Sequence, residues 1–136
     1  MSAASRIQVQ IGFPLLVVSP DEQDHQALHR ILQHDCQLHG AAGRRDALRF
    51  IRQWRPWVVV CDQTLADGDW RDLLRELQRE PKMPPLIVSS RLADDRLWAE
   101  ILNLGGYDLL AKPFAATEVS RVVRLAAHRG GVAEAR

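Results

Sequence analysis

The chain has 136 residues, which is enough for one domain with its own core and too few for two. Its 18 basic and 17 acidic residues give a formal net charge of +1 and are spread along the whole sequence, so no global field favours nucleic acid or an anionic membrane. No apolar run approaches the roughly 18 residues that a membrane span needs, and we expect a cytoplasmic protein.

An apolar run at residues 13–18 (FPLLVV) predicts the first strand, and residues 1–12 form a lead-in with little pattern. The next four residues (SPDE) predict a helix start, with Ser19 as the N-cap and Glu22 closing a capping box. The helix continues to Leu32 along one apolar face.

The rest of the chain repeats this alternation of strand and helix. Short apolar runs predict four more strands, and apolar residues at helical spacing predict four more helices. The predicted strands are 36–42, 57–62, 86–90 and 107–111, and the predicted helices are 43–55, 70–80, 93–104 and 115–128. The Gly/Ala-rich residues 129–136 predict a flexible tail or the start of a linker.

The two cysteines, Cys36 and Cys61, both fall in predicted strands. They lie far apart and show neither CxxC nor Cys/His spacing. We therefore expect two buried free thiols rather than a structural disulfide or a zinc site.

Five strands that alternate with five helices predict an α/β domain with a doubly wound parallel sheet, because right-handed crossovers place helices on both faces. The expected strand order is 2-1-3-4-5, that of a flavodoxin-like three-layer sandwich. In that order the carboxyl ends of strands 1, 3, 4 and 5 meet at one edge of the sheet. Four polar side chains should converge there: Ser19, Asp62, Ser89 and Lys112.

These residues, in this order along the chain, resemble a response-regulator receiver domain (CheY-like) of two-component signalling over about residues 13–128. The resemblance is carried by an aspartate that ends the third strand, a serine that ends the fourth and a Lys-Pro-Phe that follows the fifth: Asp62, Ser89 and Lys112-Pro113-Phe114. The segment before the lysine, GGYDLL at residues 105–110, is similar to the family's Gly-Ala-x-Asp-Tyr-Leu.

The resemblance implies a phosphorelay module in which Asp62 accepts a phosphoryl group as an acyl phosphate. Ser89 would donate a hydrogen bond to a phosphoryl oxygen, with Ser90 as the fallback, and Lys112 would pair with the carboxylate or the phosphoryl group. The Asp62 carboxylate and the backbone carbonyl of Thr64 would be ligands of Mg²⁺. The implied partner is a sensor histidine kinase or a phosphotransfer protein.

Two departures from the family pattern affect the metal site and the switch. Ser19 and Pro20 replace the acidic pair that normally follows the first strand, so Mg²⁺ should bind weakly or not at all. Asp21 is a weak candidate ligand, because the capping box places it in the first helical turn. Leu109 stands where the family commonly has a Tyr or Phe that reorients on phosphorylation.

Two alternatives to a phosphorylated receiver stay open. The first is a pseudo-receiver that acts as a protein-interaction module without phosphorylation, which the Ser19-Pro20 step favours. The second, more remote, is a phosphatase of the haloacid-dehalogenase type, which also uses an aspartate at a strand end. The sequence Asp62-Gln63-Thr64-Leu65 lacks the second acidic residue that such an enzyme uses as general acid and base, and we expect no enzyme activity.

Two tryptophans carry separate expectations. Trp70 follows the loop after Asp62 and should lie close to the pocket. Trp98 either packs on its own helix or anchors a partner, since Leu102 and Leu104 already account for the core-facing positions of that helix. In the second interpretation a partner or a second copy docks on the face of the fourth helix, fifth strand and fifth helix, which includes Leu109, and no nucleic acid or membrane is contacted directly.

Overall fold

A computed structural model of the chain describes residues 12–135 and places side chains up to Gly131. Apart from Gly12, the predicted lead-in therefore lies outside the described residues. In chain order the elements are β1 (Phe13–Val18), α2 (Glu22–Leu32), β2 (Cys36–Ala41), α3 (Arg44–Trp54), β3 (Val58–Asp62), β4 (Thr64–Leu65), β5 (Gly68–Asp69), α4 (Trp70–Leu77), β6 (Leu86–Ser90), α5 (Asp95–Leu104), β7 (Asp108–Ala111) and α6 (Ala116–Ala135).

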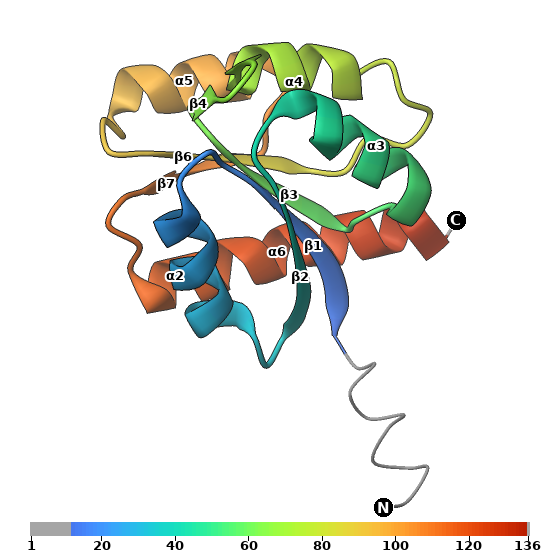
Figure 1. Cartoon of the computed structure of the whole chain (residues 1–136), viewed down its shortest axis with the longest axis horizontal. Helices are drawn as coiled ribbons and strands as arrows, with labels where there is room; N and C mark the ends of the chain where they lie inside the picture. Colours follow the sequence, from blue (N-terminus) through green and yellow to red (C-terminus); the bar gives the residue numbers. More distant parts are fainter. Residues whose placement is uncertain (1–11, 136) are drawn as a thin grey trace, which may run out of the picture.

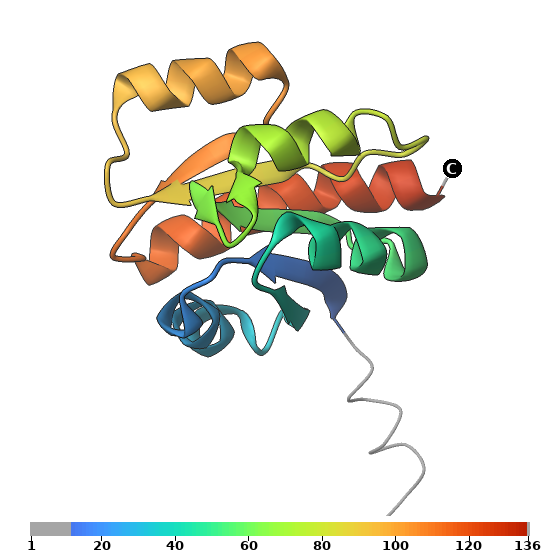
Figure 2. The same ribbon diagram turned by 45° about the horizontal axis from the view of Figure 1, so that its top comes forward.

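Five strands form one parallel sheet in the order β2-β1-β3-β6-β7. Figures 1 and 2 show α3, α4 and α5 on one face of this sheet and α2 and α6 on the other. Because β6 and β7 are the fourth and fifth strands of the sheet in chain order, the predicted doubly wound α/β fold and its order 2-1-3-4-5 are confirmed. The loops that follow the strands lie at the carboxyl edge of the sheet, where the four predicted polar residues are located.

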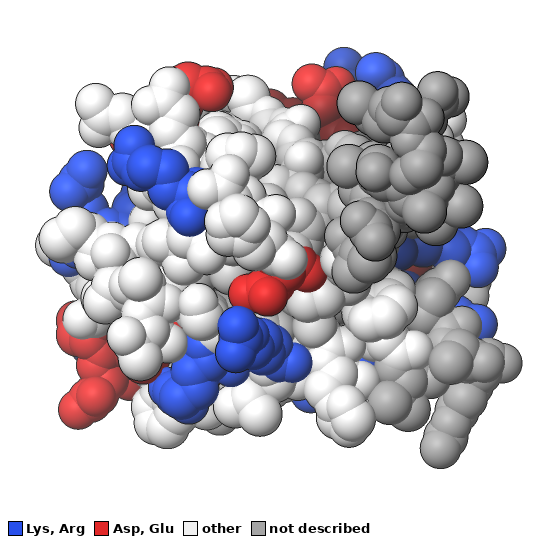
Figure 3. Space-filling model, turned by 90° about the horizontal axis from the view of Figure 1, so that it is seen from below, with Lys and Arg blue, Asp and Glu red and all other residues white. Residues whose placement is uncertain are grey.

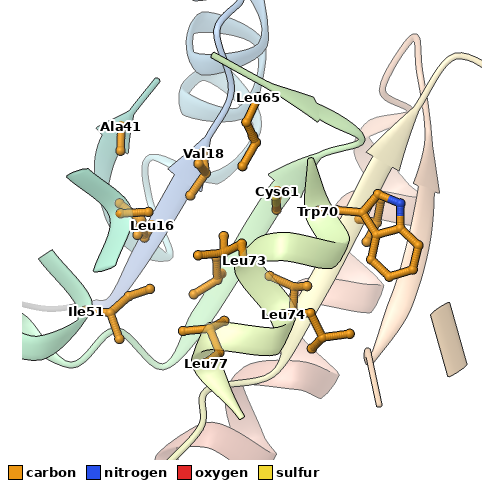
Figure 4. Packing of buried hydrophobic residues seen from close by; sticks show 14 of the residues in the cluster. Leu16, Val18, Ala41, Ile51, Cys61, Leu65, Trp70, Leu73, Leu74 and Leu77 are labelled. Atoms are coloured by element: carbon orange, nitrogen blue, oxygen red, sulfur yellow. The ribbon is translucent and has the colours of Figure 1, made fainter. Parts of the chain in front are cut away.

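The sheet separates two hydrophobic cores, and β3 contributes to both because successive side chains of a strand point to opposite faces. Val59 and Cys61 pack under α3, α4 and α5, in the cluster shown in Figure 4, whereas Val58 and Val60 pack under α2 and α6. Cys36 and Cys61 are both buried and free, as predicted. Burial is the main reason why the pKa of Cys36 rises to about 12, so its thiol is neutral.

Trp70 belongs to the first of these cores, and its backbone N–H donates a hydrogen bond of 3.2 Å to the carbonyl of Gln63, the residue after Asp62. The two-residue strands β4 and β5 pair antiparallel and reverse the chain just before α4. As the first residue of α4, Trp70 is fully buried and lies in the same cluster as Leu73 and Leu74 (Figure 4). Its indole Nε1 has no hydrogen-bond partner among the described residues.

The start of α2 also differs from the prediction. Asp21, not Ser19, is the N-cap, and its side chain accepts a hydrogen bond from the backbone N–H of Gln23. Pro20 therefore lies before the helix instead of opening it. The Ser19 hydroxyl instead donates a hydrogen bond to the buried carboxylate of Asp24.

On α5 the core-facing positions are Leu97 and Ile101, one helical turn apart. Leu102 and Leu104, which the sequence placed inward, are 41% and 45% exposed. The helix thus buries a narrow stripe and presents apolar side chains to its surroundings.

The last helix runs through Ala135 and includes most of the predicted flexible tail. Gly130 packs closely against the segment before β3: a Cβ on it would lie only 2.1 Å from the backbone carbonyl oxygen of Trp57. Glycine permits this close approach of α6 to the segment before β3, so it is a packing residue and not a helix breaker. None of the described helices combines the length and apolarity that a bilayer span requires.

The face of the molecule seen in Figure 3 carries small, separate groups of basic and acidic side chains among uncharged residues. Arg124 of α6 and Asp35, in the turn before β2, form an ion pair at 3.0 Å. No broad area of one sign is seen on this face, in keeping with the near-neutral composition.

Candidate functional site

The carboxyl edge of the sheet brings the four predicted polar residues together. Asp62 ends β3, and Ser89 is its register partner on β6. Ser19 follows β1 directly, and Lys112 follows β7. This juxtaposition follows from strand order alone, because the carboxyl ends of neighbouring parallel strands meet at the same edge.

Lys112 lies at the centre of the site, and its ammonium group contacts two carboxylates. Its Nζ lies 2.7 Å from Asp62 Oδ1 and 2.9 Å from Asp24 Oδ2. The exposed fractions of the three side chains are 8% for Lys112, 14% for Asp62 and 7% for Asp24. These are charge-assisted hydrogen bonds in a site that is largely shielded from water.

Asp24 is the residue that the sequence analysis missed. It lies in the first turn of α2, and its Oδ2 also accepts a hydrogen bond of 2.7 Å from the Ser19 hydroxyl. The sequence did contain a signal: Asp24 is four residues before Leu28, on the same buried stripe of the helix. A charged residue at such a position needs a buried partner, and Lys112 supplies it.

The ammonium of Lys112 is stabilised in its charged form despite burial. Burial alone lowers the pKa of Lys112, but the hydrogen bonds and negative charges of Asp62 and Asp24 outweigh it, so its pKa is raised above the usual value. With both carboxylates ionised, the three side chains together carry one net negative charge.

The two serines of β6 have different partners. Ser89 is buried, and its hydroxyl donates a hydrogen bond of 3.4 Å to Asp62 Oδ1. The Ser90 hydroxyl donates to the Gln63 side chain and accepts from the backbone N–H of Leu92. Ser89, and not the fallback Ser90, therefore lies beside the Asp62 carboxylate.

Lys112 and Ser89 both contact Oδ1 of Asp62. No described residue donates a hydrogen bond to Oδ2. The neighbouring Cys61 thiol donates to the backbone carbonyl of Asp62 at 3.2 Å, and burial raises the pKa of this thiol well above its ordinary value. Cys61 is thus a neutral core residue and does not compete as a nucleophile.

The residues present are a poor match for Mg²⁺, which takes near-octahedral oxygen ligands and usually one or two carboxylates. The Asp21 side chain accepts a hydrogen bond from Gln23 as the cap of α2. Thr64 lies in β4, paired with Asp69. Within the part of the chain that the structure describes, no three His, Cys, Asp or Glu side chains are grouped to hold a metal ion. Among the described residues, Asp24 is the carboxylate that shares an ion-pair partner with Asp62, and the Lys112 ammonium group lies between the two.

A groove of about 410 Å³ lies beside the site, on the face of α5, β7 and the start of α6. Trp98 is 47% exposed at its edge, and its indole N–H donates to Asp108 Oδ1 at 3.1 Å. Leu109, the other residue expected on this face, is partly buried against the core under α5. The charged residues that line the groove are all acidic: Asp94, Asp95, Asp108 and Glu118.

Comparison with known proteins agrees with this geometry. The family described as the response regulator receiver domain matches residues 15–124. Among curated proteins, the transcriptional regulatory protein PmrA of Pectobacterium parmentieri is 36% identical over 115 residues, which are 81% of this chain and 50% of that protein. The chain thus spans about half the length of this relative.

Solved receiver structures share the fold. The signal receiver domain of an HD domain-containing protein from Pseudomonas fluorescens superposes with a TM-score of 0.80 at 26% identity, over 94% of this chain and 96% of that one. The beryllofluoride-activated NtrC4 receiver domain dimer gives a TM-score of 0.78 at 22% identity, over 86% and 98%. Together with the family match over most of its length, these similarities show that the chain belongs to the response regulator receiver domain family of two-component signalling.

Proposed function

We propose that this receiver keeps Asp62 as its phosphoacceptor and uses Lys112, in place of a firmly held Mg²⁺, as the cation of its pocket. The observation that carries the proposal is the contact of one ammonium group with both Asp62 and Asp24 at 2.7 and 2.9 Å. Phosphoryl transfer depends mainly on positioning and on neutralisation of charge, so a pocket with one Lys and an extra carboxylate should react slowly.

The chemistry follows from the two oxygens of Asp62. Lys112 and Ser89 hold Oδ1, which directs Oδ2 towards an incoming phosphoryl donor. Oδ2 attacks the phosphorus of a phosphohistidine or a phosphoramidate, an oxygen–phosphorus bond forms, and the phosphorus–nitrogen bond breaks. The protonated donor nitrogen leaves with the bonding electron pair, and Asp62 becomes an acyl phosphate.

Wild-type protein incubated with phosphoramidate and millimolar Mg²⁺ is expected to gain a single phosphoryl group in only a minor fraction of molecules, because the pocket is short of positive charge. Intact-mass spectrometry measures that fraction, and the Asp62→Asn variant is the control. Stoichiometric modification of the wild type would contradict the compromised site. A modified fraction that persists in Asp62→Asn would contradict Asp62 as the acceptor.

A second candidate is a pseudo-receiver that binds a partner without phosphorylation. It is favoured by the Ser19-Pro20 step, which removes the family's acidic pair, and by the aliphatic Leu109 at the usual switch position. Complete absence of modification, with the fold intact, would select this candidate. The haloacid-dehalogenase alternative gains no support. Such an enzyme needs a second acidic residue as general acid and base, and Asp24, the carboxylate near Asp62, forms an ion pair with Lys112.

The partner of either candidate should dock in the groove beside Trp98. Four carboxylates line this groove, and none of the described residues that line it is basic, so it suits a protein that offers an apolar side chain flanked by Lys or Arg. A homodimer built groove to groove would face like charges and is the less favoured occupant. We propose a sensor kinase, a phosphotransfer protein or an output protein of that chemistry, encountered in the cytoplasm.

A further inference from the structure

We propose that Asp24 is a positioning residue that holds Lys112 away from an incoming phosphoryl group and thereby slows phosphorylation of Asp62. The inference rests on the proposed role of Asp62 as phosphoacceptor. It assigns a function to a carboxylate outside the residues that mark the family in this sequence.

Asp24 is held firmly in place. Its Oδ2 accepts hydrogen bonds from the Ser19 hydroxyl at 2.7 Å and from Lys112 at 2.9 Å, and its side chain is 7% exposed. It also stands on a helix that buries Leu28 and Leu32 against the sheet. The two hydrogen bonds and the low exposure of the side chain together hold the carboxylate beside Lys112.

Lys112 has limited capacity for a new ligand while this contact exists. A lysine ammonium group has three N–H donors, and Asp62 and Asp24 each accept from it at less than 3 Å. A phosphoryl group on Asp62 would need the same ammonium to stabilise its oxygens. Asp24 is therefore an internal competitor for the ammonium group that contacts Asp62.

The negative charge of Asp24 should also slow phosphorylation of Asp62. A phosphoryl donor is an anion, and it approaches a pocket in which two carboxylates outnumber one ammonium group. In a site shielded from water, like charges within a few ångströms repel strongly. Neutralising Asp24 should both free Lys112 and remove this repulsion.

The opposite interpretation, in which Asp24 is a helpful ligand for a cation, predicts the opposite sign. If Asp24 recruited Mg²⁺ to the pocket, its loss would slow the reaction. The two interpretations can thus be separated by the direction of one rate change.

The test compares wild type, Asp24→Asn and Asp21→Asn in phosphoramidate with millimolar Mg²⁺, with initial rates followed by intact mass. Asp24→Asn is expected to react at least about tenfold faster than wild type, because an isosteric amide keeps the Ser19 contact without the charge. Asp21→Asn is the matched control: it removes the same charge from the same helix turn but has no contact with Lys112. It should stay close to the wild-type rate.

Two further variants make the outcome unambiguous. Asp24→Glu keeps the charge and should remain slow, whereas general damage to the fold would not produce a gain in rate. Asp24→Asn combined with Asp62→Asn should take up no phosphoryl group; persistent uptake would refute the proposed acceptor rather than the role of Asp24. An Asp24→Asn rate equal to or below that of wild type, or an equal acceleration in Asp21→Asn, would overturn the inference.

Discussion

Replacement of Lys112 by methionine is expected to lower the free energy of unfolding by about 3–5 kcal/mol at neutral pH, as removal of one partner from a buried ion pair does. The variant would leave the carboxylates of Asp24 and Asp62 side by side with no cation between them. Urea unfolding of the two proteins measures the difference.

The difference in the free energy of unfolding between wild type and Lys112→Met should depend on pH in a predictable direction. Because the folded-state pKa of Lys112 is raised, its contribution is fully present below the unfolded value of about 10.4 and is lost only as the pH rises through the folded value. The gap between the two proteins should thus persist from neutral pH to about pH 10.

The control for Lys112→Met is the double variant Lys112→Met with Asp24→Asn. Removing one of the two opposed charges should restore much of the lost stability, since the sites are in contact and their effects are not additive. A single variant that loses less than about 1 kcal/mol, or a double variant that is no better, would show that the three charges are not coupled as described.

Replacement of Trp70 by alanine is expected to cost about 3–5 kcal/mol, the usual range for a fully buried tryptophan. The indole fills the core under α4 with Leu73 and Leu74, and its loss leaves a cavity there. Trp70→Phe should cost much less, because the indole N–H has no partner among the described residues and phenylalanine therefore gives up no hydrogen bond.

Trp54 is the matched control for this prediction. It is 60% exposed on α3, and Trp54→Ala should change the stability by no more than about 0.5 kcal/mol. Chemical denaturation of all three variants gives the comparison. A Trp70→Ala cost as small as that of Trp54→Ala would contradict the burial of Trp70 in the core.

The order of strands and helices was predictable because it depends on the spacing of apolar residues, which can be read directly from the sequence. The strand at Leu86–Ser90 lies at its predicted residues, and Asp62, Ser89 and Lys112 meet because strand order places them at one edge. Local signals were less reliable where tertiary contacts compete with them. Ser19 has the chemistry of an N-cap, but its hydroxyl donates a hydrogen bond to the buried Asp24 in the first turn of α2 instead.

Two residues show what periodicity could not supply. Asp24 occupies an apolar position of α2, and its meaning depends on Lys112, 88 residues later in the chain. Gly130 looks like a helix breaker by composition, yet it lets α6 approach the backbone of Trp57. In both cases the partner is distant in sequence, so no local pattern could identify the contact.

We propose that Lys112 takes the place of a tightly held metal ion between Asp24 and Asp62. The most direct test of this claim is the thermal unfolding of the wild-type protein as Mg²⁺ is raised through the millimolar range, because a ligand that binds the folded state raises its stability. We expect no saturable rise in Tm. A saturable rise that disappears in Asp62→Asn would contradict the claim.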